Sequence, residues 1–188
     1  MQHLERYFKE HPVIASIRTE EELYQAIKSD VIAIVIMGGS ILNLNSMVEV
    51  IKENDKLIFI HLDLVRGFAR DVQAVRFLAI NELCDGIIST KSKLIQEAIK
   101  QDLMGIQRLF LLDSDALKTG RNMVKNSKPS ALEVLPGIAA PYLIERLESD
   151  IKYPIIAGGL IRTKEEIKKL VEKGVLAVST GKQELWYK

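Results

Sequence analysis

The chain contains a single cysteine, Cys84, among 188 residues. One thiol cannot form a disulfide within the chain, and no second sulfur ligand is available to build a zinc knuckle. A catalytic cysteine would normally need a histidine base, and nothing in the sequence places His3, His11 or His61 beside it. Because free cysteine is commonly a small buried apolar residue, we interpret Cys84 as structural.

The chain also lacks an excess of charge of either sign and any long apolar run. Its 26 basic and 25 acidic residues give a net charge of +1, so an RNA partner would need a local basic patch. No apolar run approaches the ~20 residues that span a bilayer. Residues 1–10 mix charged and apolar side chains, unlike a signal peptide. We therefore expect a soluble, cytoplasmic protein with no membrane partner.

The remaining composition is that of one ordinary globular domain. Hydrophobic residues make up 47% of the chain and charged residues 27%. A chain of 188 residues can fill one core and is too short for two comfortable domains. No linker or low-complexity tract divides it, so residues 1–188 are expected to form a single domain.

Short β-branched runs alternate with stretches of helical period along the whole chain. Thr19 and Thr163 each precede an acidic first turn, which predicts capped helix starts after them. The predicted strands are 13–17, 31–37, 57–63, 86–90, 108–113, 131–135, 154–157 and 175–179.

Eight successive strand–helix units without a reversal predict an α/β fold, a small (β/α)8 TIM-type barrel with short helices and loops. Such barrels usually have ~250 residues, so the helices must be short and one could be absent. An open doubly wound sheet is the alternative.

Glycine and hydroxyl residues follow the last two predicted strands. Barrels commonly bind phosphate at this place, with backbone N–H groups that glycine exposes and with the N-terminus of a helix. A glycine pair alone could simply turn the chain, but here it is accompanied by hydroxyl residues after the next strand. We predict a phosphate site formed by Gly158, Gly159, Ser179, Thr180 and Gly181.

Charged residues also lie within or at the ends of apolar strands, where burial requires partners. An ion-pair network inside the barrel and a polar ligand site explain them equally well. We expect Asp63, Arg108 and Glu133 to point inward and to share hydrogen bonds with each other or with ligand hydroxyls. Lys91 as a Schiff-base lysine is disfavoured by its polar neighbours. If these charged residues form a ligand site, the predicted ligand-binding residues are Arg18, His61, Asp63, Lys91, Arg108 and Glu133. We expect no metal and no cofactor.

Residues 118–130 carry four cations and no acid. This stretch is either a solvated helix face or a patch for an anionic partner. The four cations are Lys118, Arg121, Lys125 and Lys128. Arg66 and Arg162, at predicted strand ends, are alternatives for the same role.

Several blocks of the sequence resemble the bacterial glycerol uptake operon antiterminator regulatory proteins. The longer ones are Asp85–Lys91, Ile106–Ser114, Leu132–Gly137 and Ile156–Ile161, and the shorter ones are Ile14–Arg18, His61–Leu64 and Glu184–Trp186. They cover nearly the whole chain in the same order. One departure lies after Asp63-Leu64, where the family has Ile or Val followed by His-Gly and this chain has Val65-Arg66-Gly67.

The resemblance implies a small barrel without catalysis that senses glycerol-3-phosphate as its effector. With this ligand bound, such a regulator lets transcription pass a terminator in the leader RNA of glycerol-uptake genes. Leader mRNA would then be the partner of the basic residues in 118–130 or of Arg66 and Arg162. The chain could also form a homo-oligomer. Two other functions stay open: an isomerase or aldolase acting on a small phosphorylated substrate, with Asp63 or Glu133 as base and Lys91 as electrophile, or a protein-interaction scaffold.

Overall fold

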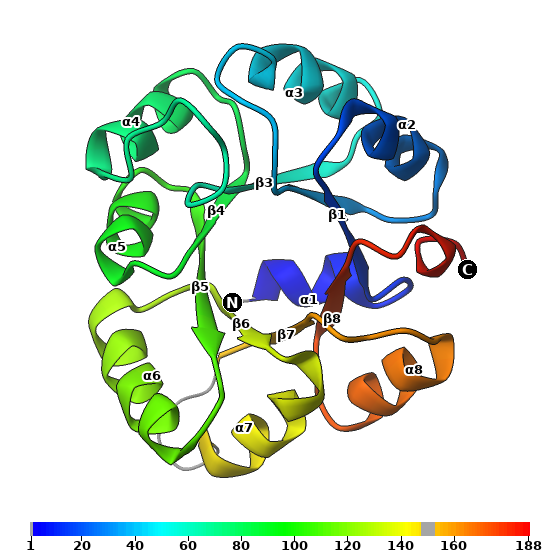
Figure 1. Ribbon diagram of the computed structural model, residues 1–188, viewed down its shortest axis with the longest axis vertical. Helices are drawn as coiled ribbons and strands as arrows, with labels where there is room; N and C mark the ends of the chain where they lie inside the picture. Colours follow the sequence, from blue (N-terminus) through cyan, green and yellow to red (C-terminus); the bar gives the residue numbers. More distant parts are fainter. Residues whose placement is uncertain (1, 148–152) are drawn as a thin grey trace.

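Eight parallel strands close into a barrel in sequence order, and helices surround it (Figure 1). The structure, a computed structural model, describes residues 2–147 and 153–188. The strands are β1 (Val13–Ile17), β2 (Ala33–Ile36), β3 (Leu57–His61), β4 (Gly86–Ser89), β5 (Met104–Phe110), β6 (Ala131–Leu135), β7 (Ile155–Gly158) and β8 (Ala177–Thr180). The predicted (β/α)8 TIM-type barrel is confirmed.

The helices are short, as the chain length requires. They are α1 (Gln2–Phe8), α2 (Glu20–Lys28), α3 (Leu44–Lys52), α4 (Val72–Ile80), α5 (Ser92–Lys100), α6 (Ser114–Ser127), α7 (Ala140–Leu147) and α8 (Lys164–Glu172), with 3-10 turns η1 (Gly137–Ala139) and η2 (Gln183–Leu185). Only α6, with 14 residues, exceeds nine. After β8 the chain makes η2 where the other strands are followed by an α-helix, so the helix that could be absent is the one after the last strand.

The predicted helix caps are present. The side chain of Thr19 accepts a hydrogen bond from the backbone N–H of Glu22 at 3.2 Å. Thr163 and Glu166 form a reciprocal capping box at the start of α8. Both caps fix the point at which a strand-end loop turns into a helix.

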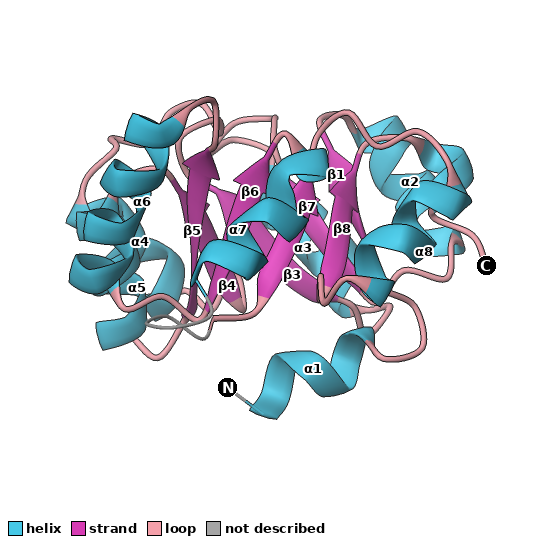
Figure 2. Ribbon diagram, turned by 90° about the horizontal axis from the view of Figure 1, so that it is seen from below, coloured by secondary structure: helices cyan, strands magenta, loops and turns pink. Residues whose placement is uncertain are grey.

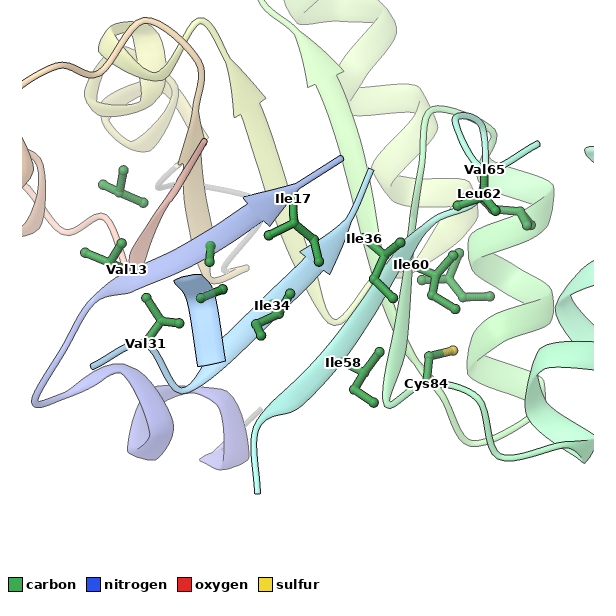
Figure 3. Packing of buried hydrophobic residues seen from close by; sticks show 14 of the residues in the cluster. Val13, Ile17, Val31, Ile34, Ile36, Ile58, Ile60, Leu62, Val65 and Cys84 are labelled. Carbon is green, nitrogen blue, oxygen red and sulfur yellow. The ribbon is translucent and has the colours of Figure 1, made fainter. Parts of the chain in front are cut away.

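Two apolar cores hold the barrel. Between strands and helices, side chains such as Ile17, Ile34 and Ile60 pack outward (Figure 3). Inside the barrel, Phe59, Ile106 and other inward side chains form a second cluster. Alternation along each strand sends neighbouring residues into one core or the other, which explains why the strands read as continuous apolar runs.

Helix α1 closes one end of the barrel, at the amino ends of the strands (Figure 2). Leu4 and Phe8 lie one helical turn apart, and both are buried in the inner cluster. The sequence did not predict this helix, because its seven residues are too few to establish a period. With that end covered, a site inside the barrel opens only at the carboxyl ends of the strands.

Cys84 lies in the outer core, and burial raises the pKa of its thiol to about 12. A neutral, buried thiol agrees with its interpretation as structural. In the part of the chain that the structure describes, no helix is both long and apolar enough to cross a membrane.

Candidate functional site

A small cavity opens at the carboxyl ends of the strands. Its volume is about 190 Å³, well below the ~300–1,000 Å³ of drug-sized pockets, so it suits a ligand of few atoms. We call it the mouth cavity; its lining is Ser16, Arg18, Met37, Arg108, Glu133, Leu135, Gly158, Gly159, Leu160, Ser179, Thr180 and Gly181. Larger hollows of about 660 and 560 Å³ lie beside α1 at the opposite end. We assign the site to the mouth cavity because buried charges and glycine loops meet there.

All five residues of the predicted phosphate site line this cavity. Arg18, at the end of β1, comes close to them: a Cβ on Gly181 would lie 3.3 Å from its Nη1 and 3.4 Å from the backbone oxygen of Ser16. Gly159 has a φ of +77°, which side-chain-bearing residues rarely adopt. The structure therefore brings the Arg18 guanidinium against Gly181, in a cavity that the glycine turn after β7 also lines.

The helix N-terminus expected beside these glycines is placed differently. Helix α8 begins at Lys164, six residues after Gly158. The backbone N–H groups of Arg162 and Thr163 donate to the Glu166 carboxylate at 2.7 and 3.1 Å. Because the capping box already uses these donors, an anion in the mouth cavity would depend on Arg18 and the glycine loops.

A buried ion pair lies in the interior of the barrel. Nε of Arg108 donates to Oε2 of Glu133 at 2.6 Å, and their side chains are 7% and 1% exposed. The two residues face each other in the register of β5 and β6. Gly158 leaves room for the acid, since a Cβ there would lie 3.1 Å from Oε1 of Glu133. Both charges point inward, as expected.

Asp63 does not join this pair. Strand β3 ends at His61, so the alternation that would place Asp63 beside it no longer applies. Its carboxylate instead accepts hydrogen bonds at 2.9 to 3.2 Å from the hydroxyls of Ser89 and Thr90 and from the backbone N–H of Thr90. Among the residues that the structure describes, Asp63 is thus tied to the end of β4.

Lys91 is exposed and lies outside the cavity lining. Its Nζ donates to the backbone oxygen of Arg70 at 3.2 Å. The predicted fifth strand, 108–113, is observed as Met104–Phe110, and Asp113 instead caps α6 through a 2.7 Å bond from the N–H of Ala116. Lys91, which was predicted as a ligand residue, therefore lies outside the mouth cavity.

His61 is buried, with 2% of its surface exposed. Neither ring nitrogen has a hydrogen-bond partner among the residues that the structure describes. Burial, and next the positive charge of Arg108, lower the pKa of His61 to about 4. The ring is therefore neutral at physiological pH.

This shift predicts a pH dependence of stability that depends on His61. The unfolded chain binds a proton on this ring below about pH 6.5, whereas the folded chain does so only near pH 4. Stability is therefore complete above pH 6.5 and falls as the pH drops toward 4, by up to about 3 kcal/mol. His11, whose pKa is also lowered by burial, adds to the wild-type slope. Urea unfolding of wild type and His61→Leu between pH 4 and 7.5 gives the free energy of unfolding of each at each pH, and the difference is the contribution of His61. If the two free energies change with pH in parallel, the prediction is contradicted.

Some lining residues were not predicted from sequence. Ser16 bonds its hydroxyl to that of Ser179 at 2.8 Å, and Met37, Leu135 and Leu160 complete the wall. Ser16 could have been predicted. It lies two residues after Ile14 in an apolar strand, so its hydroxyl points into the barrel as the side chain of Ile14 does. The three apolar residues carried no such signal.

The basic stretch forms most of α6, away from the mouth cavity. Lys118 lies 3.3 Å from Asp115, and both are exposed. Nη2 of Arg121 donates to the backbone oxygen of Arg146 at 2.9 Å, which ties α6 to α7. Lys125 is exposed on the helix. Lys128 ends the helix in a left-handed conformation and is also exposed.

The two alternative cations lie outside the lining of the mouth cavity. Nε of Arg66 approaches the backbone oxygen of Gly39 at 3.4 Å, so this residue joins the loops after β2 and β3. Arg162 is exposed, and its backbone oxygen accepts from Nζ of Lys182 at 2.9 Å. Within the described residues, no group of three or more His, Cys, Asp or Glu is placed to hold a metal ion.

Fold and site define a small (β/α)8 barrel with a polar cavity at the carboxyl ends of its strands. A family model described as glycerol-3-phosphate responsive antiterminator matches residues 13–186, and the chain belongs to this family. It is 33% identical over 178 residues to the uncharacterized protein YgcP of Escherichia coli (strain K12), covering 95% of this chain and 93% of that protein.

Two solved structures are similar over nearly their whole length. The glycerol uptake operon antiterminator regulatory protein of Listeria monocytogenes str. 4b F2365 has a TM-score of 0.89 at 31% identity, covering 95% of this chain and 96% of that one. A glycerol uptake operon antiterminator-related protein of Thermotoga maritima MSB8 has a TM-score of 0.82 at 28% identity, covering 93% and 96%. The resemblance noted in the sequence is thus confirmed.

Proposed function

We propose that the chain binds glycerol-3-phosphate in the mouth cavity and, with this ligand bound, acts on the leader RNA of glycerol-uptake genes as a transcription antiterminator in the cytoplasm. The ligand is an effector that is released unchanged. The phosphate lies against Gly158, Gly159 and the Ser179–Gly181 segment, and the glycerol end points into the barrel.

The observation that carries this proposal is the position of Arg18 against Gly181, beside the glycine turn that follows β7. A phosphate monoester carries about −1.5 to −2 charge at pH 7. A guanidinium and exposed backbone N–H groups are the donors that bind such a dianion most strongly. The small volume of the cavity favours a three-carbon phosphate over a nucleotide.

The arrangement of the candidate catalytic residues argues against an isomerase or aldolase. Glu133 is held by Arg108 at 2.6 Å, and Asp63 accepts several hydrogen bonds at the end of β4. Lys91 is exposed and does not line the cavity. A free base opposite an electrophile is therefore missing from the described part of the cavity wall. After incubation with the protein, isotopically labelled glycerol-3-phosphate should be detected unaltered by mass spectrometry. A labelled product would favour an isomerase or aldolase.

Replacing Arg18 by glutamine should weaken binding of glycerol-3-phosphate about 10- to 100-fold. A hydrogen bond to a charged group contributes about 1.5–3 kcal/mol, and glutamine is a shorter polar side chain without the charge. Isothermal titration calorimetry measures the affinity. The control is Arg162→Gln, which removes the same charge from an exposed position outside the lining and should leave the affinity unchanged.

Equal affinities of wild type and Arg18→Gln for glycerol-3-phosphate would show that the phosphate does not bind beside Arg18. If no three-carbon phosphate raises the melting temperature of the wild type, the ligand assignment itself fails, because a ligand of the native state must raise it. A gel shift of leader RNA with and without glycerol-3-phosphate then tests the regulatory step.

A further inference from the structure

His61 is a buried polar side chain whose nitrogens lack partners among the described residues. Its 2% exposure excludes bulk water as the partner. Leaving buried donors and acceptors unpaired is costly, and such costs are retained mainly where function requires them. The rest of the inner core offers no such group in the described chain, since His61 alone has buried side-chain atoms without partners.

His61 does not itself line the mouth cavity, but its ring lies next to residues that do. Leu57 and Phe59 of β3 belong to the interior cluster, so alternation points His61 into the barrel as well. In the register of β2 and β3, Ile36 pairs with Ile60, so the position of Met37 comes next to that of His61. Met37 lines the cavity and Arg108, whose charge acts on His61, lines it too. Met37 is unbranched and flexible, and the proposal below requires it to shift so that a ligand reaches the ring.

The charges around the inner end of the cavity are already paired or hydrogen-bonded: the Asp63 carboxylate, whose charge acts on His61, accepts hydrogen bonds from Ser89 and Thr90. Arg108 and Glu133 neutralise each other at 2.6 Å, and the Ser16 and Ser179 hydroxyls bond to one another at 2.8 Å. The imidazole can both donate and accept a hydrogen bond, as a hydroxyl can. The outer end, in contrast, has the guanidinium of Arg18 against Gly181, and this guanidinium forms no ion pair with any residue that the structure describes.

We propose that His61 recognises an uncharged hydroxyl of the ligand and thereby selects a phosphorylated polyol over a phosphorylated acid. This inference rests on the proposed function, because it takes the phosphate to lie at Arg18 and Gly181. A ligand hydroxyl supplies the missing partner to the ring. A carboxylate at the same place would bring a second negative charge near Asp63, while the nearby cation, Arg108, is already paired with Glu133.

The test compares three ligands by calorimetry at pH 7.5: glycerol-3-phosphate, 3-phosphoglycerate and inorganic phosphate. The wild type should bind glycerol-3-phosphate at least about 10-fold more tightly than either of the others. In His61→Leu this preference should fall about 10- to 100-fold, while inorganic phosphate binds with unchanged affinity. His61→Gln, whose amide also donates and accepts, should recover part of the preference.

A second readout is independent of any ligand. Because leucine fills a similar volume without unpaired nitrogens, His61→Leu should raise the melting temperature of the free protein by about 2–8 °C. The matched control is Gln107→Leu. Gln107 is equally buried, but its Nε2 donates to the backbone oxygens of Ser89 and Thr90 at 3.2 and 3.0 Å. Its replacement should lower the melting temperature and leave the ligand preference intact.

The outcomes separate the two proposals. If no phosphate compound binds the wild type, the proposed function fails. If glycerol-3-phosphate binds and His61→Leu keeps the wild-type preference, the function stands and the role of His61 is wrong. A His61→Leu variant that is less stable than the wild type, or that does not fold, would also overturn the inference, since the ring would then have structural partners.

Discussion

Replacing Arg108 by methionine is expected to lower the free energy of unfolding by about 3–5 kcal/mol, because it leaves the carboxylate of Glu133 buried without its counter-charge. For a domain of this size the melting temperature should fall by roughly 6–20 °C. Urea unfolding gives the free energy. The matched control is Lys168→Met: the pair Lys168–Glu172 is 4.0 Å apart with side chains 80% and 62% exposed, so its loss should cost less than about 0.5 kcal/mol.

The double variant Arg108→Met/Glu133→Leu should regain most of this loss. Two apolar side chains in contact need no counter-charge, and replacing both partners of a buried pair is often neutral or stabilising. Since both residues line the mouth cavity, the double variant should nevertheless bind glycerol-3-phosphate weakly. A stable variant without ligand affinity would show that the pair is retained for binding. A double variant as unstable as Arg108→Met would contradict this explanation.

Much of the fold could be predicted because its signals are local. The runs Val13–Ile17 and Ala131–Leu135 are strands with the predicted bounds, since β-branched residues end there at polar or proline positions. The fifth strand could not be placed as well. It begins at Met104-Gly105, where Gly105 is present because a Cβ would lie 2.8 Å from the side chain of Ile95, a contact that no local pattern reveals.

The candidate site could be predicted in part for the same reason. Glycine and hydroxyl residues after β7 and β8 mark the cavity through their type and position. The pairing of Arg108 with Glu133 depends on the register of two strands, which the sequence does not fix. The partners of Asp63 depend on where β3 ends. Contacts of this kind require the closed barrel, and Arg18 meets Gly181 only because β1 pairs with β8.

The surface proposed to contact leader RNA lies outside the lining of the mouth cavity. Arg121 is committed to the backbone of Arg146, so its replacement would disturb the packing of α7 as well as the charge. Lys118, Lys125 and Lys128 are exposed, and we call them the α6 lysines. Lys118 and Lys125 lie seven residues apart, on one side of α6, and Lys128 follows directly after the last helical residue, so the three cations could contact successive phosphates.

Replacing the three α6 lysines by glutamine should weaken binding to leader RNA and reduce the slope of log affinity against log salt by up to about 2. Each lost phosphate contact to single-stranded RNA lowers this slope by about 0.7, and glutamine removes the charge while keeping an extended polar side chain. Gel shifts at salt concentrations from about 50 to about 300 mM give the slope. The affinity for glycerol-3-phosphate without RNA should stay unchanged, since none of the three lines the mouth cavity.

The control removes three lysines from α8, Lys164, Lys168 and Lys169, which are also exposed. It changes the net charge by the same amount, so it separates a local patch from the overall charge of a chain that carries only +1. The α8 variant should keep the wild-type slope. If the α6 variant keeps it too, the α6 lysines are a solvated helix face. Arg66 and Arg162 would then be replaced next, because an RNA site beside the ligand would couple the two binding events through shared loops rather than across the barrel.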